Sequence, residues 1–370
     1  MGGTLKKRLA MMSATISFAM LTSSADALVI NNYFSYYLRS SPRADEIMAA
    51  INYSSRAFEA ALSNDVTVNI QYDLSNDNNY LARAGYAGSA ASKDDYLEMM
   101  QDNAAAHPEN TVLAQAIKDI GKGNFANRNL TEVLGSTAQF RANGIPAVGN
   151  YDIFTYEDGT PIFDLGGEAL KGGGLDGVVS LASIGEMLFG FDIPAYDGTP
   201  QSIRYAAINT IQHEIMHVLG GGNTSIGSET YLEPLDMFRY SAPGVANFGE
   251  PGLAYFSIDG GKTAIQEFYW QPIKAGDPNG WGPITPCSTG YGMGGPIGLF
   301  MDSISCSNQP TVTLSLDSPE GIQLMALGWN PRVAAVPEAA TWTMMILGFG
   351  GIGAALRRRH RKPTSRVRFV

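Results

Sequence analysis

The feature that most constrains this chain is the pentad His213-Glu214-Ile215-Met216-His217, which lies in a segment, Ile203–Leu219, with the apolar spacing of a helix. Four residues make about one helical turn, so both imidazoles project from one helix face and can reach the same metal ion. The carboxylate between them is placed to polarise water without binding the metal. The pentad therefore predicts a zinc ion (Zn²⁺) held by His213 and His217, with Glu214 as general base.

The residues around the pentad support a helix that carries a metal site. The chain has only four histidines, and two of them fall at this spacing. Ser202 is a suitable N-cap, and the run Gly220-Gly221-Gly222 is typical of a helix C-terminus. Apolar residues recur every three or four positions, so one stripe can pack on a core while the histidines occupy another face. These apolar residues are Ile208, Ile211, Ile215, Val218 and Leu219.

The N-terminus has the pattern of a secretory signal peptide. A basic cluster at residues 6–8 precedes an apolar run, Leu9–Leu21, and a small-x-small cleavage site, Ala25-Asp26-Ala27. We expect residues 1–27 to be a signal peptide and the mature chain to begin near Leu28. The sequence leaves open whether residues 28–43 form a pro-segment.

The C-terminus has a second export signal. Pro337 and Glu338 precede an apolar run, Ala339–Leu356, and a basic cluster at residues 357–362. About 18 apolar residues can cross a membrane, and the positive-inside rule keeps the basic end cytoplasmic. The pattern closely resembles the PEP-CTERM sorting tail of Gram-negative bacteria, although Ala339 stands where that tail usually has a second Pro. The resemblance implies an exosortase-type sorting enzyme as partner.

The expected localisation follows from both ends. Residues 337–370 form the sorting tail, whose transmembrane span at 339–356 holds the exported precursor in the inner membrane. Processing of this tail then releases the body, residues 28–336, to the cell surface or beyond.

The body differs from the two ends in charge. The chain has 25 Lys and Arg residues and 35 Asp and Glu residues. The two ends carry ten of the basic and two of the acidic residues. Residues 28–336 therefore have 15 basic and 33 acidic residues, a net charge of −18. Such an acidic body repels nucleic acid and anionic lipid, so neither is an expected partner of the body. Cys287 and Cys306 are the only cysteines, and we expect them to pair in an oxidising compartment.

The body contains no linker or low-complexity run, which favours one globular unit. Periodicity predicts an α+β order, with a twisted mixed sheet packed on the pentad helix and a loop-rich C-terminal part. The predicted helices are Ala44–Leu62, Asp95–Ala106, Thr111–Ile120 and Pro319–Leu327. The predicted strands are Val66–Tyr72, Gly177–Ala182 and the start of Ala254–Lys262. Val66–Tyr72 alternates as a half-buried strand does, and Ala254–Lys262 ends in an Asp259-Gly260 turn.

Three separated motifs occur in order around the pentad: Leu235–Gly244, Tyr255–Gly261 and Met325–Trp329. Together they resemble a family of PEP-CTERM-associated metalloproteases, and the helix followed by Val-Thr-Val-Asn-Ile at residues 66–70 is similar to that family too. The resemblance covers most of residues 200–360. It implies a metzincin-like zinc-peptidase domain that hydrolyses a protein or peptide substrate, without identifying that substrate.

The third metal ligand is left open by the sequence. In the metzincin pattern H-E-x-x-H-x-x-G-x-x-H, Gly220 matches the glycine, but Asn223 stands where the third His would be. An Asn oxygen is a poor zinc ligand. The family resemblance favours Asp236, whose alternative role is to pair with Arg239 or to cap a turn. The other carboxylates that follow His217 within 20 residues are Glu229 and Glu233.

Two functions are compatible with these observations. The first is a secreted zinc-dependent endopeptidase in which Glu214 transfers the proton and Tyr240 donates to the oxyanion. The alternative is a non-catalytic surface or matrix protein with a degenerate metal site, and Asn223 keeps this alternative open. Met237 either lies beneath the site, as in a Met-turn, or is an ordinary core residue.

Overall fold

The three-dimensional arrangement comes from a computed structural model of the chain. Some of the predicted features lie outside the residues that it describes: residues 1–26 of the signal peptide, the N-cap Ser202, both cysteines and most of the tail. The described residues are 27–76, 81–120, 131–147, 149, 174–182, 189–190, 205–222, 231–247, 254–268, 281–282, 311–333, 346–349, 352 and 357.

A four-stranded mixed sheet with the strand order β1-β2-β6-β3 forms the centre of the fold. β1, β2 and β6 are parallel to one another, whereas β3 runs antiparallel to β6 at one edge. This mixed sheet agrees with the predicted α+β class. The strands are β1 (Val29–Phe34), β2 (Thr67–Ser75), β6 (Gly177–Ala182) and β3 (Ala82–Tyr86).

Strand β2 is buried on both faces, so the prediction of a half-buried strand was wrong. Its apolar residues alternate as predicted, but the polar residues Asn69 and Gln71 between them are also 0% exposed. Asn69 finds hydrogen-bond partners on that second face. Its side chain accepts from Asn31 Nδ2 at 2.9 Å and donates to the Gly174 carbonyl at 3.1 Å. The polar side chain of Asn69 can be buried because neighbouring segments supply its hydrogen-bond partners.

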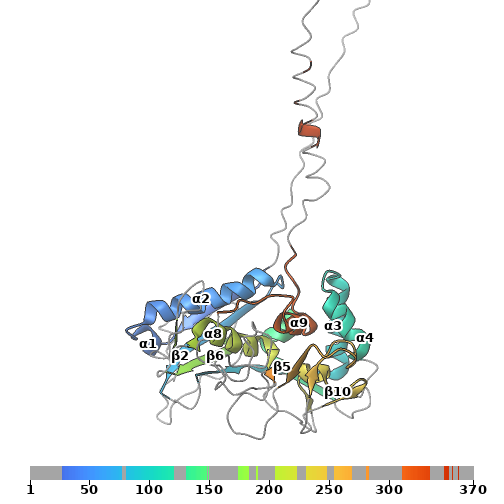
Figure 1. Cartoon of the computed structure of the whole chain (residues 1–370), viewed down its shortest axis with the longest axis horizontal. Helices are drawn as coiled ribbons and strands as arrows, with labels where there is room; N and C mark the ends of the chain where they lie inside the picture. The colour runs from blue at the N-terminus through green and yellow to red at the C-terminus, as the bar shows by residue number, and fades with distance from the viewer. Residues whose placement is uncertain are drawn as a thin grey trace, which may run out of the picture.

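Two helices, α2 (Ala44–Ala61) and α8 (Ala207–Met216), pack on each other and on the main sheet (Figure 1). α2 has almost its predicted bounds, and its fully buried residues include Ile47, Ile51 and Phe58. Their spacing of four and seven residues is that of one helix face. A short helix, α1 (Tyr36–Arg39), links β1 to α2. Residues 28–43 therefore contribute β1 and α1 to the body.

The pentad helix begins later than predicted. The sequence suggested a start at Ile203, but Tyr205 and Ala206 form the two-residue strand β8, which pairs in parallel with β7 (Phe189–Gly190). Extended backbone at these two residues cannot also be helical, so α8 starts at Ala207.

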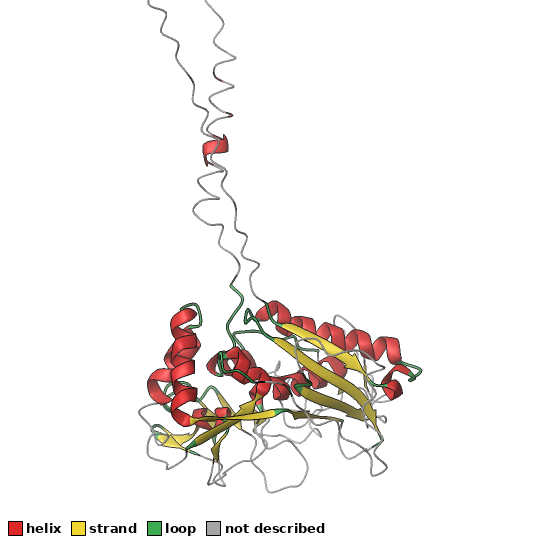
Figure 2. Ribbon diagram, turned by 180° about the vertical axis from the view of Figure 1, so that it is seen from behind, coloured by secondary structure: helices red, strands yellow, loops and turns green. Residues whose placement is uncertain are grey.

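A second, three-stranded sheet has the order β4-β5-β9 and lies beside helices α3 and α4 (Figure 2). Only Ala87 separates β3 from β4, so one extended segment supplies an edge to both sheets. α3 begins two residues before its predicted start because the Ser92 hydroxyl caps it, accepting from Asp95 N at 3.1 Å. The elements are β4 (Gly88–Ser92), β5 (Glu132–Ser136), β9 (Tyr231–Leu232), α3 (Lys93–Ala106), α4 (Thr111–Ile120) and α6 (Thr137–Ala142).

The C-terminal part of the body consists of short strands and one helix, α9 (Pro319–Ala326). The predicted Asp259-Gly260 turn is confirmed, because Asp259 Oδ1 accepts from Thr263 N at 2.9 Å and Gly260 has a positive φ of 73°. The strands follow the order β11-β10-β12-β13-β14. They are β10 (Arg239–Ala242), β11 (Val245–Ala246), β12 (Tyr255–Phe256), β13 (Gln266–Phe268) and β14 (Trp281–Gly282).

One hydrophobic cluster extends from Leu28 to Trp329 through the described residues. The segment that closes the body is held inside this cluster by buried asparagine amides. Because these amides satisfy buried backbone carbonyls of the segment, they help to fix it in position. The bonds run from Asn64 and Asn103 to the Gly328 carbonyl, from Asn110 to that of Trp329 and from Asn143 to that of Leu327, at 3.2, 2.8, 3.1 and 2.8 Å.

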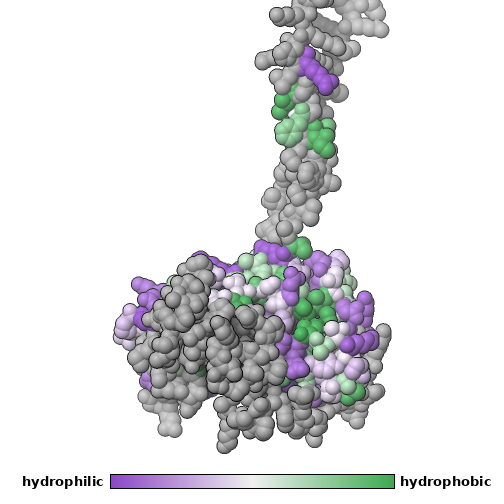
Figure 3. Space-filling view, in the orientation of Figure 1, coloured by the Kyte–Doolittle hydropathy of each residue, from purple (hydrophilic) through white to green (hydrophobic). Residues whose placement is uncertain are grey.

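The described residues of the tail form short helical pieces at 346–349, 352 and 357. Their large apolar side chains are exposed, as the green atoms of these residues show in Figure 3. In the part of the chain that the structure describes, no helix combines the length and apolarity needed to cross a membrane. The predicted span at 339–356 lies mostly outside that part.

Candidate metal centre

The structure brings the imidazoles of His213 and His217 together. Their Nε2 atoms are 3.0 Å apart, and the ring centroids are separated by 4.7 Å with an interplanar angle of 70°. Both side chains are half-buried, so a ligand from solvent can reach them. Two nitrogen donors are thereby directed at one point at the surface of the helix.

The second histidine begins a π-helical turn, η1 (His217–Gly221), that continues α8. Such turns are rare and are found often at functional sites. The turn ends through Gly220, which has φ 88° and ψ 10°, a left-handed conformation that favours glycine. Gly222 has ordinary extended backbone, but a Cβ atom at this position would overlap the His217 ring. In the glycine run, Gly220 therefore ends the helix, and Gly222 leaves room for the His217 ring.

Two side chains from the C-terminal segment hold the end of η1. The Trp329 indole Nε1 donates to the Leu219 carbonyl at 2.9 Å, and the Gln323 amide donates to the Gly221 carbonyl at 2.8 Å. The last carbonyls of a helix have no partner within it, and here both donors are buried. These bonds connect the pentad helix to residues more than 100 positions later in the chain.

Glu214 projects from α8 toward the interior and is 5% exposed. It lies within electrostatic range of Tyr72 on β2: burial raises the pKa of the Tyr72 phenol, the nearby Ser55 side chain opposes this rise, and the negative charge of Glu214 adds to it. The phenol therefore stays neutral at ordinary pH.

Asp236 is placed in a short 3-10 helix, η2 (Pro234–Phe238), that contacts η1. Its Oδ2 atom accepts from Glu233 N at 3.2 Å as part of a reciprocal capping pair. The turn-capping role that the sequence left open for Asp236 is therefore present in the structure. Met237 follows it and is 3% exposed, in the position of a core residue next to η1.

Arg239, the other residue considered as a partner of Asp236, is buried at 2% exposure. Its guanidinium carbon lies 4.2 Å from the centroid of the Phe268 ring, a cation–π contact. Burial lowers the pKa of Arg239, and the charge of Asp236 opposes this shift. The charges of Asp236 and Arg239 thus do interact, next to the pentad helix.

The structure does not complete a three-ligand site. Within the described ranges, no group of three or more His, Cys, Asp or Glu side chains is arranged to hold a metal ion. Asn223 and Glu229, two of the alternatives for the third ligand, lie outside those ranges. The ligand role of Asp236 stays a prediction.

Tyr240, the predicted oxyanion donor, is 5% exposed on β10. Its ring packs on the turn after β12: a Cβ atom on Gly261 would lie 2.9 Å from Tyr240 Cδ1. Gly261 has a φ of 82°, a conformation that favours glycine. Because Gly261 has no side chain, the Tyr240 ring can pack against this turn. The catalytic role of Tyr240 also stays a prediction.

Three residues that surround the site were missed by sequence reasoning. Trp329, Gln323 and Tyr72 come from distant parts of the chain, and no local spacing connects them to the pentad. Trp329 ends one of the three family motifs, which was the one available sign of its importance.

Comparison with known proteins adds one finding about the tail. Residues 335–359 match the PEP-CTERM protein-sorting motif. This motif is recognised by exosortase and implies an exported, surface-targeted protein, as the sequence predicted. No curated protein and no solved structure matches the chain. The predicted likeness to metalloproteases therefore depends on the residues of the body alone.

Proposed function

We propose that the body of this exported protein is a zinc-dependent endopeptidase. The observation that carries the proposal is the pair of Nε2 atoms of His213 and His217, 3.0 Å apart on one helix face with Glu214 between them in sequence. Two His donors with an adjacent carboxylate form the functional core of the H-E-x-x-H arrangement.

The donor pair fits a zinc ion. Two nitrogens that each lie 2.0–2.1 Å from a tetrahedral ion are separated by about 3.3 Å. The observed 3.0 Å reaches this value with a small rotation of either ring. A carboxylate has about four lone-pair sites, so the bond from Glu233 N to Asp236 does not by itself prevent Asp236 from supplying the third ligand.

The proposed chemistry divides between the ion and the chain. Bound zinc would polarise the scissile carbonyl and acidify the attacking water. Glu214 accepts the proton of that water and returns it to the leaving amine, and its low exposure keeps competing solvent away. Tyr240 is the proposed donor to the oxyanion.

A strand edge next to this site is suited to an extended peptide. β3 is the antiparallel edge strand of the main sheet, and it contacts both α8 and η1. An edge strand presents backbone N–H and C=O groups that can pair with an extended chain. A peptide added to β3 would pass close to the pentad helix, which supports a peptide or protein substrate.

A second function is favoured by a specific observation. No third metal ligand is found in the part of the chain that the structure describes, and Asn223 replaces the expected third His. A folded body without metal would then serve as a non-catalytic surface or matrix protein.

Metal content and hydrolysis of the purified exported protein separate the two functions. The peptidase proposal expects about one zinc per chain, and the Glu214→Gln variant should keep the metal and lose hydrolysis of a casein-like substrate. Glu132→Gln, a change of an exposed carboxylate on β5, is the matched control and should keep both. Full activity of Glu214→Gln would rule out the mechanism, and a folded wild-type protein with neither metal nor activity would favour the non-catalytic function.

The tail has a proposed role of its own. We infer that its apolar run holds the precursor in the inner membrane until the sorting enzyme acts. The exposed side chains of Ile346, Leu347 and Phe349 support this step, because apolar side chains of this kind are stable in lipid.

A further inference from the structure

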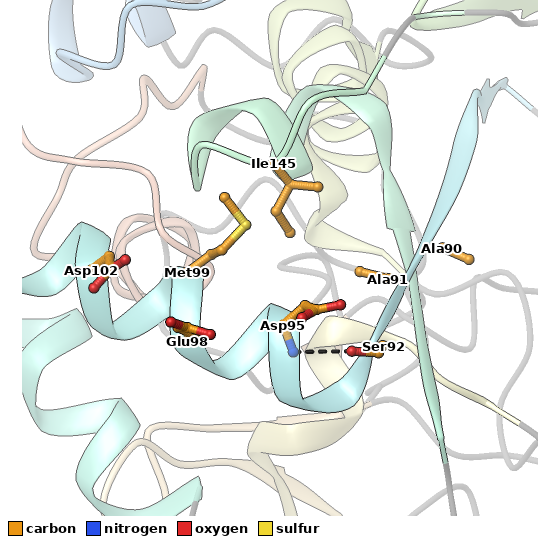
Figure 4. A pocket seen from close by; sticks show the side chains of 8 residues that line it. All are labelled: Ala90, Ala91, Ser92, Asp95, Glu98, Met99, Asp102 and Ile145. Carbon is orange, nitrogen blue, oxygen red and sulfur yellow. Dashed lines mark hydrogen bonds between the residues drawn. The ribbon is translucent and has the colours of Figure 1, made fainter.

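A groove of about 560 Å³ lies between strand β4 and helix α3 (Figure 4). Met99 from α3 and Ile145 from the loop after α6 extend toward each other and give it an apolar floor. Small residues of β4 form one wall, and the acidic face of α3 forms the other. Both an apolar base and charged groups are therefore available to a bound chain.

The β4 wall of the groove is the edge of a sheet. Ala90, Ala91 and Ser92 all line the groove, so it extends along the C-terminal half of β4. Among the described strands, β4 pairs with β5 alone. Edge strands are usually protected by Lys, Pro or a bulge, but β4 reads Gly-Ser-Ala-Ala-Ser in unbroken register. An unprotected edge of this kind is suited to pairing with another extended chain.

The α3 wall carries three exposed carboxylates, Asp95, Glu98 and Asp102. Spacings of three and four residues place them on one helix face, over about 10 Å. Within the described residues, none of the three forms an ion pair with Lys or Arg. A strand paired with β4 repeats its side chains about every 7 Å on each face, so more than one of its basic residues can meet these carboxylates.

We propose that this groove binds an extended peptide that carries Lys or Arg side chains. The peptide adds a strand to β4 through backbone hydrogen bonds, its apolar side chains contact Met99 and Ile145, and its basic side chains pair with the carboxylates of α3. The proposal does not depend on the metal centre. It gives the protein a second recognition surface that holds whether or not the pentad is catalytic.

The test measures binding of a fluorescent eight-residue peptide of alternating Lys and Thr to the full purified chain by anisotropy. Three further probes are measured on the wild-type protein. They are the same peptide with Glu in place of each Lys, the Lys-Thr peptide N-methylated at alternate residues, and calcium ion alone. The variant Asp95→Asn/Glu98→Gln/Asp102→Asn removes the charges of the groove. The matched variant Asp45→Asn/Asp65→Asn/Asp317→Asn removes three exposed carboxylates elsewhere.

The basic peptide should bind, and the groove variant should weaken its binding about fivefold to tenfold because three surface ion pairs are lost. The matched variant should bind as the wild type does, the Glu peptide should not bind, and N-methylation should reduce binding because it blocks strand pairing. Equal binding by the groove variant, or equal binding of the N-methylated peptide, would overturn the proposal. Binding of calcium at these carboxylates with no binding of the peptide would overturn it as well.

Discussion

The indole of Trp329 donates a hydrogen bond to the backbone carbonyl of Leu219 at 2.9 Å, which joins the end of the pentad helix to the last buried segment of the body. Both residues are completely buried. The position of His217 therefore depends on a segment that is synthesised near the end of the chain.

Trp329→Phe should lower the free energy of unfolding by about 1–3 kcal/mol, because the buried Leu219 carbonyl loses its donor while the aromatic ring remains. Urea unfolding of the exported protein measures this change. Tyr36→Phe is the matched control: Tyr36 is 61% exposed, and its variant should unfold at the wild-type urea concentration. Equal stability of the two variants would show that the Trp329 bond does not stabilise the helix end.

Gly222→Ala should weaken zinc binding about 10- to 100-fold, since the new methyl group would displace the His217 ring. The backbone at Gly222 is extended, so the effect comes from space rather than from strain. Gly88→Ala is the control, because the nearest side-chain atom to its added Cβ is Leu134 Cδ1 at 3.8 Å, an ordinary contact. Competition with a chelator of known affinity gives the zinc dissociation constant of each variant. An unchanged constant for Gly222→Ala would contradict a metal at His217.

Asp236→Asn separates the two roles considered for Asp236. Asn caps a turn about as well as Asp does but is a poor zinc ligand. If Asp236 binds the metal, as we predict, the variant should keep its stability and lose zinc affinity. The loss should exceed roughly 10- to 100-fold, which is the usual cost of losing a hydrogen-bond partner of a metal ligand. Zinc affinity like that of the wild type would leave capping as its role, and Asp236→Ala provides the comparison in which the cap is lost too.

Asp73 should make stability depend on pH in a predictable direction. Burial raises its pKa above the ordinary 3.8, although hydrogen bonds from Ser35 and from Leu74 N oppose this rise. The folded state then binds the proton more tightly than the unfolded state does. The stabilisation from Asp73 is therefore complete below pH 3.8 and is lost as pH rises through the folded pKa.

The variant Asp73→Asn lacks this titration. Its unfolding free energy relative to wild type should rise as pH increases from below 3.8 through the raised pKa. Urea unfolding at a series of pH values measures the difference, with Asp45→Asn, an exposed carboxylate, as control. A difference that stays constant with pH would contradict the raised pKa.

The tail should be absent from the released protein. Mass spectrometry of the extracellular fraction should find a chain that starts near Leu28 and ends near Pro337, and replacement of Pro337 and Glu338 by Ala should keep the protein in the membrane fraction. Val333→Ala, a change of an exposed residue just before the motif, should leave release unaffected. Recovery of the intact basic tail on the released protein would be evidence against a transient anchor.

Much of the local structure could be predicted from the sequence. α4 and β6 have the predicted bounds, and α2 and α9 each end one residue early, because apolar residues at helical or alternating spacing identify the face that must be buried. The sorting motif was also identified from its residues. β3, β4 and β5 were not predicted, since short strands rich in Gly, Ala and Ser have little apolar contrast.

The sequence by itself determined that His213 and His217 share a helix face, because the spacing of residues in a helix is fixed by backbone geometry. Only the tertiary structure decided that Trp329 and Gln323 hold the end of that helix and that the polar face of β2 is buried. These contacts join segments whose approach depends on the packing of the whole core. Local periodicity sets the direction of a side chain within its element, but which distant group it meets is set by how the elements pack.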